Sequence, residues 1–199
     1  MSDVTTMTDQ PANFAFDAAN AEKARKIIAR YPTGRQASAV LPLLDMAQRQ
    51  AGGWLPRTAM DHVAGVLEMA PIRVYEVATF YSMFNLKPVG KHHVQICRTT
   101  PCWLRGSDAL RQVCETKLGV GLKQVTEDGL FSISEVECLG ACCNAPMVQI
   151  NDDFYEDLDE ASINKVLDAF RRGETPKPGP QVDRQTSAPE GGPTTLKGE

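Results

Sequence analysis

The chain has 199 residues and a mass of 21.8 kDa, which allows one domain or two small ones and excludes a large multidomain enzyme. Apolar residues make up 42%, and the formal net charge of -4 leaves no basic surplus for binding a nucleic-acid backbone. The longest uncharged stretch, 138–151, is shorter than the roughly 20 apolar residues that a membrane-spanning helix needs. No basic residue precedes Lys23, so no export or import peptide is predicted.

Residues 1–19 are polar and show no periodicity, which predicts a mobile N-terminal arm. Residues 20–88 then carry apolar residues at helical spacing, which predicts a domain of four packed helices. We expect the first helix to begin at Asn20, the second at Ser38 and the fourth at Pro71. Thr58 and Asp61 have the spacing of a capping box and predict the start of the third.

The large apolar residues of the fourth helix and its exit could line a cofactor pocket or fill a core. At this spacing we expect them to fill the core that the helices share, because large apolar residues are usually buried for their own sake. These residues are Val74, Val77, Ala78, Tyr81 and Met83.

Residues 89–172 change character and predict a mixed β-sheet with flanking helices. Strand-like runs at 93–97 and 122–125 enclose a helical stretch at 106–118, which is the order of a βαβ unit. Two further strands are expected at 131–136 and 147–150, with a turn at Asp152 and Asp153, and a closing helix is expected at 159–172 with Asp159 as its cap. The fold class is therefore α+β, with a helical bundle followed by a domain of thioredoxin-like order.

Residues 173–199 are rich in Gly and Pro and almost free of apolar side chains, so we expect a disordered tail.

Four of the six cysteines form two tight pairs, Cys97 with Cys102 and Cys138 with Cys142, in a C-x4-C and a C-x3-C spacing. Each pair follows a predicted strand, and loops that leave the same edge of a sheet can converge. Without an export signal, such cysteines point to metal or redox chemistry and away from a disulfide framework. The sequence therefore predicts a site built from these four thiols.

Three kinds of site are compatible with that spacing. A structural zinc site uses four cysteines, but a four-residue gap is at the wide end of its range. Thiol-disulfide exchange usually requires C-x-x-C, which the chain lacks. A 2Fe-2S cluster fits the wider first loop best, since plant-type ferredoxins have the same first spacing.

Other residues that could carry chemistry have simpler interpretations. Cys114 lies mid-helix and is expected to be a buried thiol, and Cys143 is expected to pack inward as a small apolar residue. His92 and His93 are taken as polar residues at a strand entry, because four cysteines already satisfy a cluster. The acidic run at 152–160 is interpreted as a solvated hairpin and helix start, with docking to a basic surface as the alternative. No complete dinucleotide or phosphate-binding glycine motif is present.

Taken together, these motifs carry a family resemblance. The runs VQICRTTPCWLRG from Val94 and ECLGACCNAPM from Glu137 closely resemble the thioredoxin-like 2Fe-2S subunit of respiratory complex I, the NADH-quinone oxidoreductase. The similarity extends upstream to QRQAGGWLP from Gln48 and VYEVATFYSMF from Val74. It covers about residues 20–172 and leaves out the arm and the tail.

The resemblance implies one 2Fe-2S cluster ligated by Cys97, Cys102, Cys138 and Cys142. It implies one-electron exchange with the FMN of an adjacent flavoprotein subunit that binds NADH, so this chain is not expected to oxidise NADH alone or to contain a catalytic residue. A neighbouring iron-sulfur subunit of the peripheral arm is the second implied partner. The implied location is peripheral, on the inner face of the bacterial plasma membrane, without membrane insertion. The alternatives are the equivalent subunit of a soluble NAD-dependent formate dehydrogenase or hydrogenase, and a zinc-stabilised interaction module.

Overall fold

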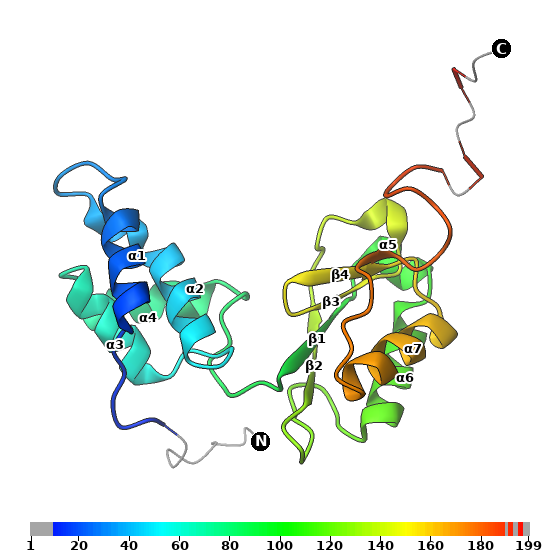
Figure 1. The fold of residues 1–199 in the computed structure, drawn as a ribbon, viewed down its shortest axis with the longest axis horizontal. Helices are drawn as coiled ribbons and strands as arrows, with labels where there is room; N and C mark the ends of the chain where they lie inside the picture. Colours follow the sequence, from blue (N-terminus) through cyan, green and yellow to red (C-terminus); the bar gives the residue numbers. More distant parts are fainter. Residues whose placement is uncertain (1–9, 190, 193–194, 197–199) are drawn as a thin grey trace. The chain divides into compact units, whose positions relative to one another are not determined.

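The computed structural model describes residues 10–189, 191–192 and 195–196 (Figure 1). Residues 1–9 of the predicted arm lie outside the described residues. The chain divides into two compact units, residues 1–88 and 89–199. Among the described residues, no helix is long and apolar enough to cross a membrane.

The first unit is built from four α-helices, as expected. They are α1 (Ala18–Ile28), α2 (Val40–Gln50), which follows the short 3-10 helix η2 (Gln36–Ala39), α3 (Arg57–Val66) and α4 (Pro71–Phe80). The predicted start at Pro71 is confirmed, because proline suits the first helical position.

The other three helix starts were predicted at the wrong residues. Helix α1 begins earlier, because the Asp17 side chain caps it by accepting a hydrogen bond of 2.7 Å from the Asn20 backbone N–H. Ser38 lies inside η2 and caps nothing. Helix α3 begins at Arg57, so the predicted capping box is not formed, and the Thr58 hydroxyl instead donates to the Pro11 carbonyl.

The core of the first unit is made mainly of small and branched apolar side chains. Helix α4 contributes Val74 and Ala78 to it, as expected. The expectation that Tyr81 and Met83 fill this core is wrong, since both are exposed, as is Phe80 at 80%. The backbone becomes extended at Tyr81, so the helix ends there. Tyr81 and Met83 therefore no longer follow the helical repeat that places Val74 and Ala78 on the buried face.

The part of the expected arm that is described packs against the helices. The Phe16 backbone N–H donates to His62 Nε2, and the Phe14 and Phe16 rings meet the His62 ring edge-on. The Gln50 side chain donates to the Ala15 carbonyl at 2.8 Å. Two aromatic residues are therefore enough to attach a segment whose composition is otherwise polar.

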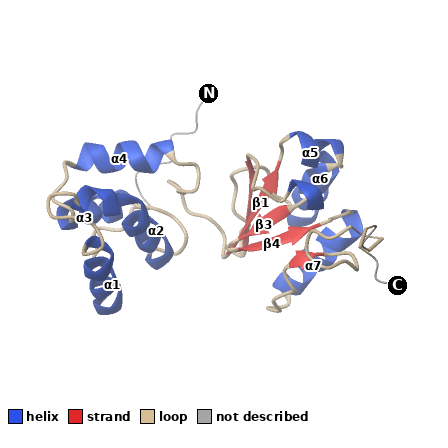
Figure 2. Ribbon diagram, turned by 90° about the horizontal axis from the view of Figure 1, so that it is seen from above, coloured by secondary structure: helices blue, strands red, loops and turns tan. Residues whose placement is uncertain are grey.

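The second unit contains a five-stranded mixed sheet in the order β2-β1-β3-β4-β5. Figure 2 shows β1, β3 and β4 side by side. Its strands are β1 (His92–Cys97), β2 (Phe131–Val136), β3 (Val148–Ile150), β4 (Asp153–Glu156) and β5 (Gly179–Pro180). Strands β1 and β2 are parallel, β3 is antiparallel to both β1 and β4, and β5 is parallel to β4.

Two strand assignments differ from the sequence-based expectation. Residues 122–125 form no strand, because Lys123 adopts a left-handed backbone conformation, and only Val125 makes an isolated bridge to Ser132. The parallel partner of β1 is β2. The turn lies one residue earlier than expected, at Asn151 and Asp152, and Asp153 is the first residue of β4.

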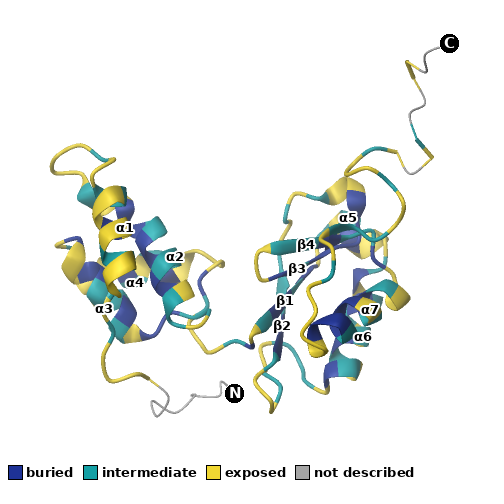
Figure 3. Cartoon of the chain, viewed as in Figure 1, coloured by how far each residue is buried: buried dark blue, intermediate teal, exposed yellow. Residues whose placement is uncertain are grey.

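Helices α6 (Ser107–Leu118) and α7 (Glu160–Arg171) pack against the sheet and enclose the main core (Figure 3). A short helix, α5 (Thr100–Leu104), precedes α6. Alternate strand residues face this core, and α7 begins with the predicted cap Asp159 in a capping box with Ser162. The expected α+β class is confirmed.

The segment after α7 differs from the expected disordered tail over its first part. Strand β5 pairs with β4 through Tyr155 and Gly179, and the Tyr155 hydroxyl donates to the Pro176 carbonyl. This segment has few apolar side chains to bury, and backbone hydrogen bonds and polar side chains attach it to the sheet.

His93 lies at the start of β1, as expected, and its side chain is buried. Its Nδ1 lies 2.7 Å from Ser132 Oγ and its Nε2 3.2 Å from Ser134 Oγ, so both ring nitrogens have partners. Burial lowers the pKa of His93 to about 4, and the ring therefore stays neutral at pH 7.

This burial predicts a pH-dependent contribution to stability. An unfolded histidine gains a proton near pH 6.5, while folded His93 does so only near 4, so the contribution is complete above 6.5 and falls as the pH is lowered toward 4. Between pH 7 and pH 5 the wild-type chain should lose about 1 to 2 kcal/mol more unfolding free energy than a His93→Gln variant. Denaturant unfolding at the two pH values measures this. An equal loss in the two proteins would contradict the buried, neutral ring.

Candidate metal centre

The two cysteine pairs leave the sheet at the same edge. Strands β1 and β2 are parallel, and their register places Cys97 opposite Val136 at the carboxyl ends of both strands. Cys102 follows in α5, Cys138 lies two residues after β2, and Cys142 begins the short 3-10 helix η3 (Cys142–Asn144). The parallel pairing therefore brings together two loops that are far apart in the sequence.

The four thiols interact within each pair and between the pairs. Cys138 Sγ and Cys142 Sγ are 3.3 Å apart, and the Cys102 thiol is in hydrogen-bond contact with Cys97. The Thr99 hydroxyl joins the pairs, since its Oγ1 lies 3.3 Å from Cys97 Sγ and it also hydrogen-bonds Cys138. The geometry thus places the predicted site residues in two pairs, and it adds Thr99 between them, which the spacing of the cysteines alone did not identify.

The centre has a buried half and an exposed half. Cys97 and Cys102 are each 1% exposed and pack with Ala145 and Met147, whereas Cys138 and Cys142 are exposed. A group bound here would be shielded from water on one side and open to a partner on the other.

The environments of the thiols shift their pKa values in opposite directions. Burial, followed by the hydrogen bond to Cys97, raises the pKa of Cys102 to about 12. The pKa of Cys138 is lowered, first by the Gly140 backbone N–H, which donates to its sulfur at 3.4 Å, and then by Cys142. Gly140 reaches this position with a φ of +86°, a conformation that other residues rarely adopt. Both hydrogen bonds stabilise the thiolate form of Cys138 relative to the thiol, and metals bind the thiolate form.

The remaining two cysteines occupy very different places. Cys114 is fully buried, as expected, and burial raises its pKa to about 12. The expectation that Cys143 packs inward is wrong, because Cys143 is exposed. Cys142 and Cys143 lie in a 3-10 helix and not in extended backbone, so their side chains do not point to opposite faces.

The donor set fits an iron-sulfur cluster. Within the described part of the chain, no three His, Cys, Asp or Glu side chains are gathered closely enough to hold one metal ion. Two thiol pairs joined through Thr99, with a backbone N–H directed at a sulfur, match the four-thiolate ligation and sulfur hydrogen bonding of a 2Fe-2S centre.

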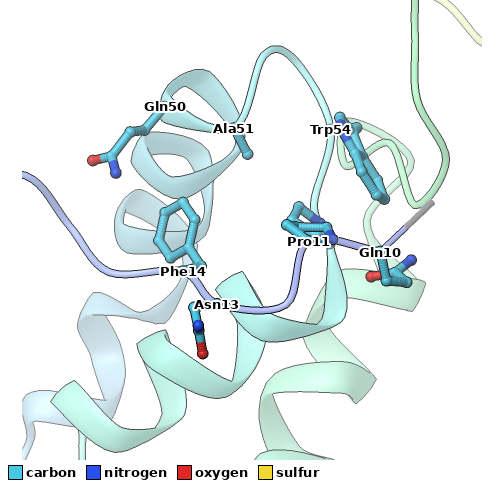
Figure 4. A pocket seen from close by; sticks show the side chains of 8 residues that line it. Gln10, Pro11, Asn13, Phe14, Gln50, Ala51 and Trp54 are labelled. Atoms are coloured by element: carbon cyan, nitrogen blue, oxygen red, sulfur yellow. The ribbon is translucent and has the colours of Figure 1, made fainter. Parts of the chain in front are cut away.

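A hollow of about 460 Å³ occurs in the first unit (Figure 4). None of the described side chains that line it is ionisable. The lining residues are Gln10, Pro11, Asn13, Phe14, Gln50, Ala51, Trp54 and Pro56.

Comparison with known proteins agrees with this geometry. The sequence pattern of the thioredoxin-like [2Fe-2S] ferredoxin family matches residues 24–171, which include all four thiols of the centre. The chain belongs to this family. The resemblance predicted from the motifs is thereby confirmed.

Several relatives are similar over most of the chain. A protein of Rickettsia felis that is named as a subunit of NADH-quinone oxidoreductase is 61% identical over 158 residues, which are 79% of this chain and 95% of the relative. The mitochondrial NADH dehydrogenase [ubiquinone] flavoprotein 2 of Dictyostelium discoideum is 49% identical over 92% of this chain and 74% of its own length.

Among solved structures, an H2-reduced NAD+-reducing [NiFe]-hydrogenase superposes with a TM-score of 0.58 at 22% identity. The superposition covers 66% of this chain and 22% of the hydrogenase chain. At this identity the likeness concerns the fold.

Proposed function

We propose that the chain is the electron-transfer subunit of NADH-quinone oxidoreductase, with one 2Fe-2S cluster at the sheet edge. The observation that carries this proposal is the convergence of four thiols at the carboxyl ends of β1 and β2 in a chain of this family. Its close relatives are named as subunits of that enzyme, which is an oxidoreductase complex.

Cys97, Cys102, Cys138 and Cys142 are the proposed ligands. When bound, a 2Fe-2S cluster takes up and returns one electron at a time. The buried Cys97 and Cys102 exclude water from the inner side, while the Gly140 N–H and the Thr99 hydroxyl offer hydrogen bonds to sulfur. Such bonds and the degree of solvent exposure set the reduction potential.

The exposed half of the centre supports electron exchange with a partner surface. A flavoprotein subunit that binds FMN and NADH is the proposed donor, because this chain has no complete dinucleotide-binding motif of its own. A neighbouring iron-sulfur subunit of the peripheral arm and a peripheral position on the inner face of the plasma membrane complete the proposal.

The ligand assignment predicts a clear difference among cysteine variants. Cys97→Ser and Cys138→Ser should lose most of the iron and acid-labile sulfide bound per chain and the visible charge-transfer absorption, because each removes one of four thiolates. Cys114→Ser and Cys143→Ser are the matched controls and should keep the wild-type spectrum, although Cys143 adjoins the ligand Cys142. An unchanged spectrum in Cys97→Ser or Cys138→Ser would show that the ligands are others.

The proposed role predicts that NADH reduces this chain only through a partner. Anaerobic addition of NADH to the cluster-loaded chain alone should leave its visible absorption unchanged, and a catalytic amount of an FMN-containing, NADH-oxidising flavoprotein subunit should bleach it. The Cys138→Ser chain with the same flavoprotein serves as the control. Bleaching without the flavoprotein would reveal a hydride-accepting site in this chain, and no bleaching with it would contradict the proposed electron transfer.

A further inference from the structure

The segment after α7 returns to the second cysteine loop. In Figure 1 this orange to red part of the chain runs beside β4 and then reaches the yellow turn that contains η3. We call residues 179–186 the strap segment. It begins with β5, continues with the Gln181 backbone N–H donating to the Glu156 carbonyl, and ends with the Thr186 carbonyl accepting from Asn144 Nδ2 at 3.0 Å.

Arg184 is the main contact between the strap segment and the loop. One of its terminal guanidinium nitrogens donates to the Cys143 carbonyl at 2.9 Å and also to Asn144 Oδ1. Its Nε lies 2.9 Å from Asp157 Oδ2, and the pair is ionic without the alignment of a hydrogen bond. Both side chains are only 10% exposed, so this charge pair differs from the solvated ion pairs of the surface.

Asn144 links the strap segment to the rest of the sheet. It is buried, its side chain also donates to Glu156, and its carbonyl accepts from the Asp157 backbone N–H at 2.8 Å. From the first cysteine loop, Arg105 Nε donates to the Ala145 carbonyl at 3.3 Å. Two carbonyls shortly after Cys142 therefore each accept a hydrogen bond from an arginine: Cys143 from Arg184 and Ala145 from Arg105.

These contacts matter because the loop has little structure of its own. Between β2 and β3 it contains only the three-residue helix η3, and Cys138 and Cys142 are exposed. A hydrogen bond from a charged donor is stronger than one between neutral groups, and it can determine whether a short loop is ordered.

We propose that the strap segment keeps the Cys138–Cys142 loop in the geometry that binds the cluster, with Arg184 as the positioning residue. The inference rests on the proposed function for the identity of the bound group, but the ordering of the loop by Arg184 can be measured independently. It also assigns a role to Asp157, which the sequence placed in a solvated acidic run.

The test uses the full chain, loaded anaerobically, as wild type and as Arg184→Gln. Hydrogen exchange followed by mass spectrometry should show the amides of residues 142–145 exchanging about tenfold faster in the variant, since a charged hydrogen bond to this backbone is lost. The visible absorption should decay faster in the presence of an iron chelator, and the EPR signal of the reduced protein should change. Arg184→Lys should restore part of the protection.

Two further variants make the test specific. Arg172→Gln removes an exposed arginine that pairs with Glu174 and does not contact the loop, so it should match wild type. The double variant Arg184→Gln with Asp157→Asn leaves no unpaired buried carboxylate and should therefore fold more readily than Arg184→Gln alone. It still lacks the donor to the Cys143 carbonyl and should still exchange faster at the amides of residues 142–145.

Unchanged exchange at the amides of residues 142–145 in Arg184→Gln and in the double variant would overturn the inference. So would a uniform rise that includes α6 and α7, because Arg184 would then act on the whole domain. A wild-type chain that binds no iron or sulfide would instead refute the proposed function, while the exchange data would still decide the role of the strap segment.

Discussion

The parallel pairing of β1 with β2 is the constraint on which the centre depends. Because the carboxyl ends of parallel strands lie at the same edge, Cys97 and Val136 are opposite each other, and the two cysteine loops begin as neighbours. An antiparallel arrangement would place the loops at opposite ends of the sheet. The core formed by α6 and α7 stabilises this pairing, and thereby the site.

The centre combines rigidity on one side with accessibility on the other. Cys97 and Cys102 belong to the end of a central strand and a short helix and are buried, so their positions follow from the core. Cys138 and Cys142 lie on an exposed loop and depend on polar contacts from Thr99, Gly140, Arg105 and Arg184. An electron carrier needs both features, because the bound group must be retained while a partner approaches it closely.

The sequence predicted the α+β class, the boundaries of several elements and the position of the cysteine pairs at strand ends, because strand periodicity and cysteine spacing are local signals. It placed a strand at 122–125, where the backbone of Lys123 turns, and it could not show which strand pairs with β1, since pairing is a tertiary property. The exposure of Tyr81 and Cys143 depends on where a helix ends and on a three-residue turn, and neither has a clear sequence pattern. The contact of Arg184 with the Cys143 carbonyl, 41 residues away in the sequence, likewise cannot be predicted from composition.

The central claim is that four thiols of this chain hold a two-iron cluster that carries one electron. The most direct measurement is the content of iron, zinc and acid-labile sulfide per chain in anaerobically purified protein, with an EPR spectrum after dithionite reduction. The account predicts about two irons and two sulfides per chain and a rhombic S = 1/2 signal, as expected for a 2Fe-2S centre with four thiolates. One zinc per chain without sulfide would contradict it and would make the site a structural one.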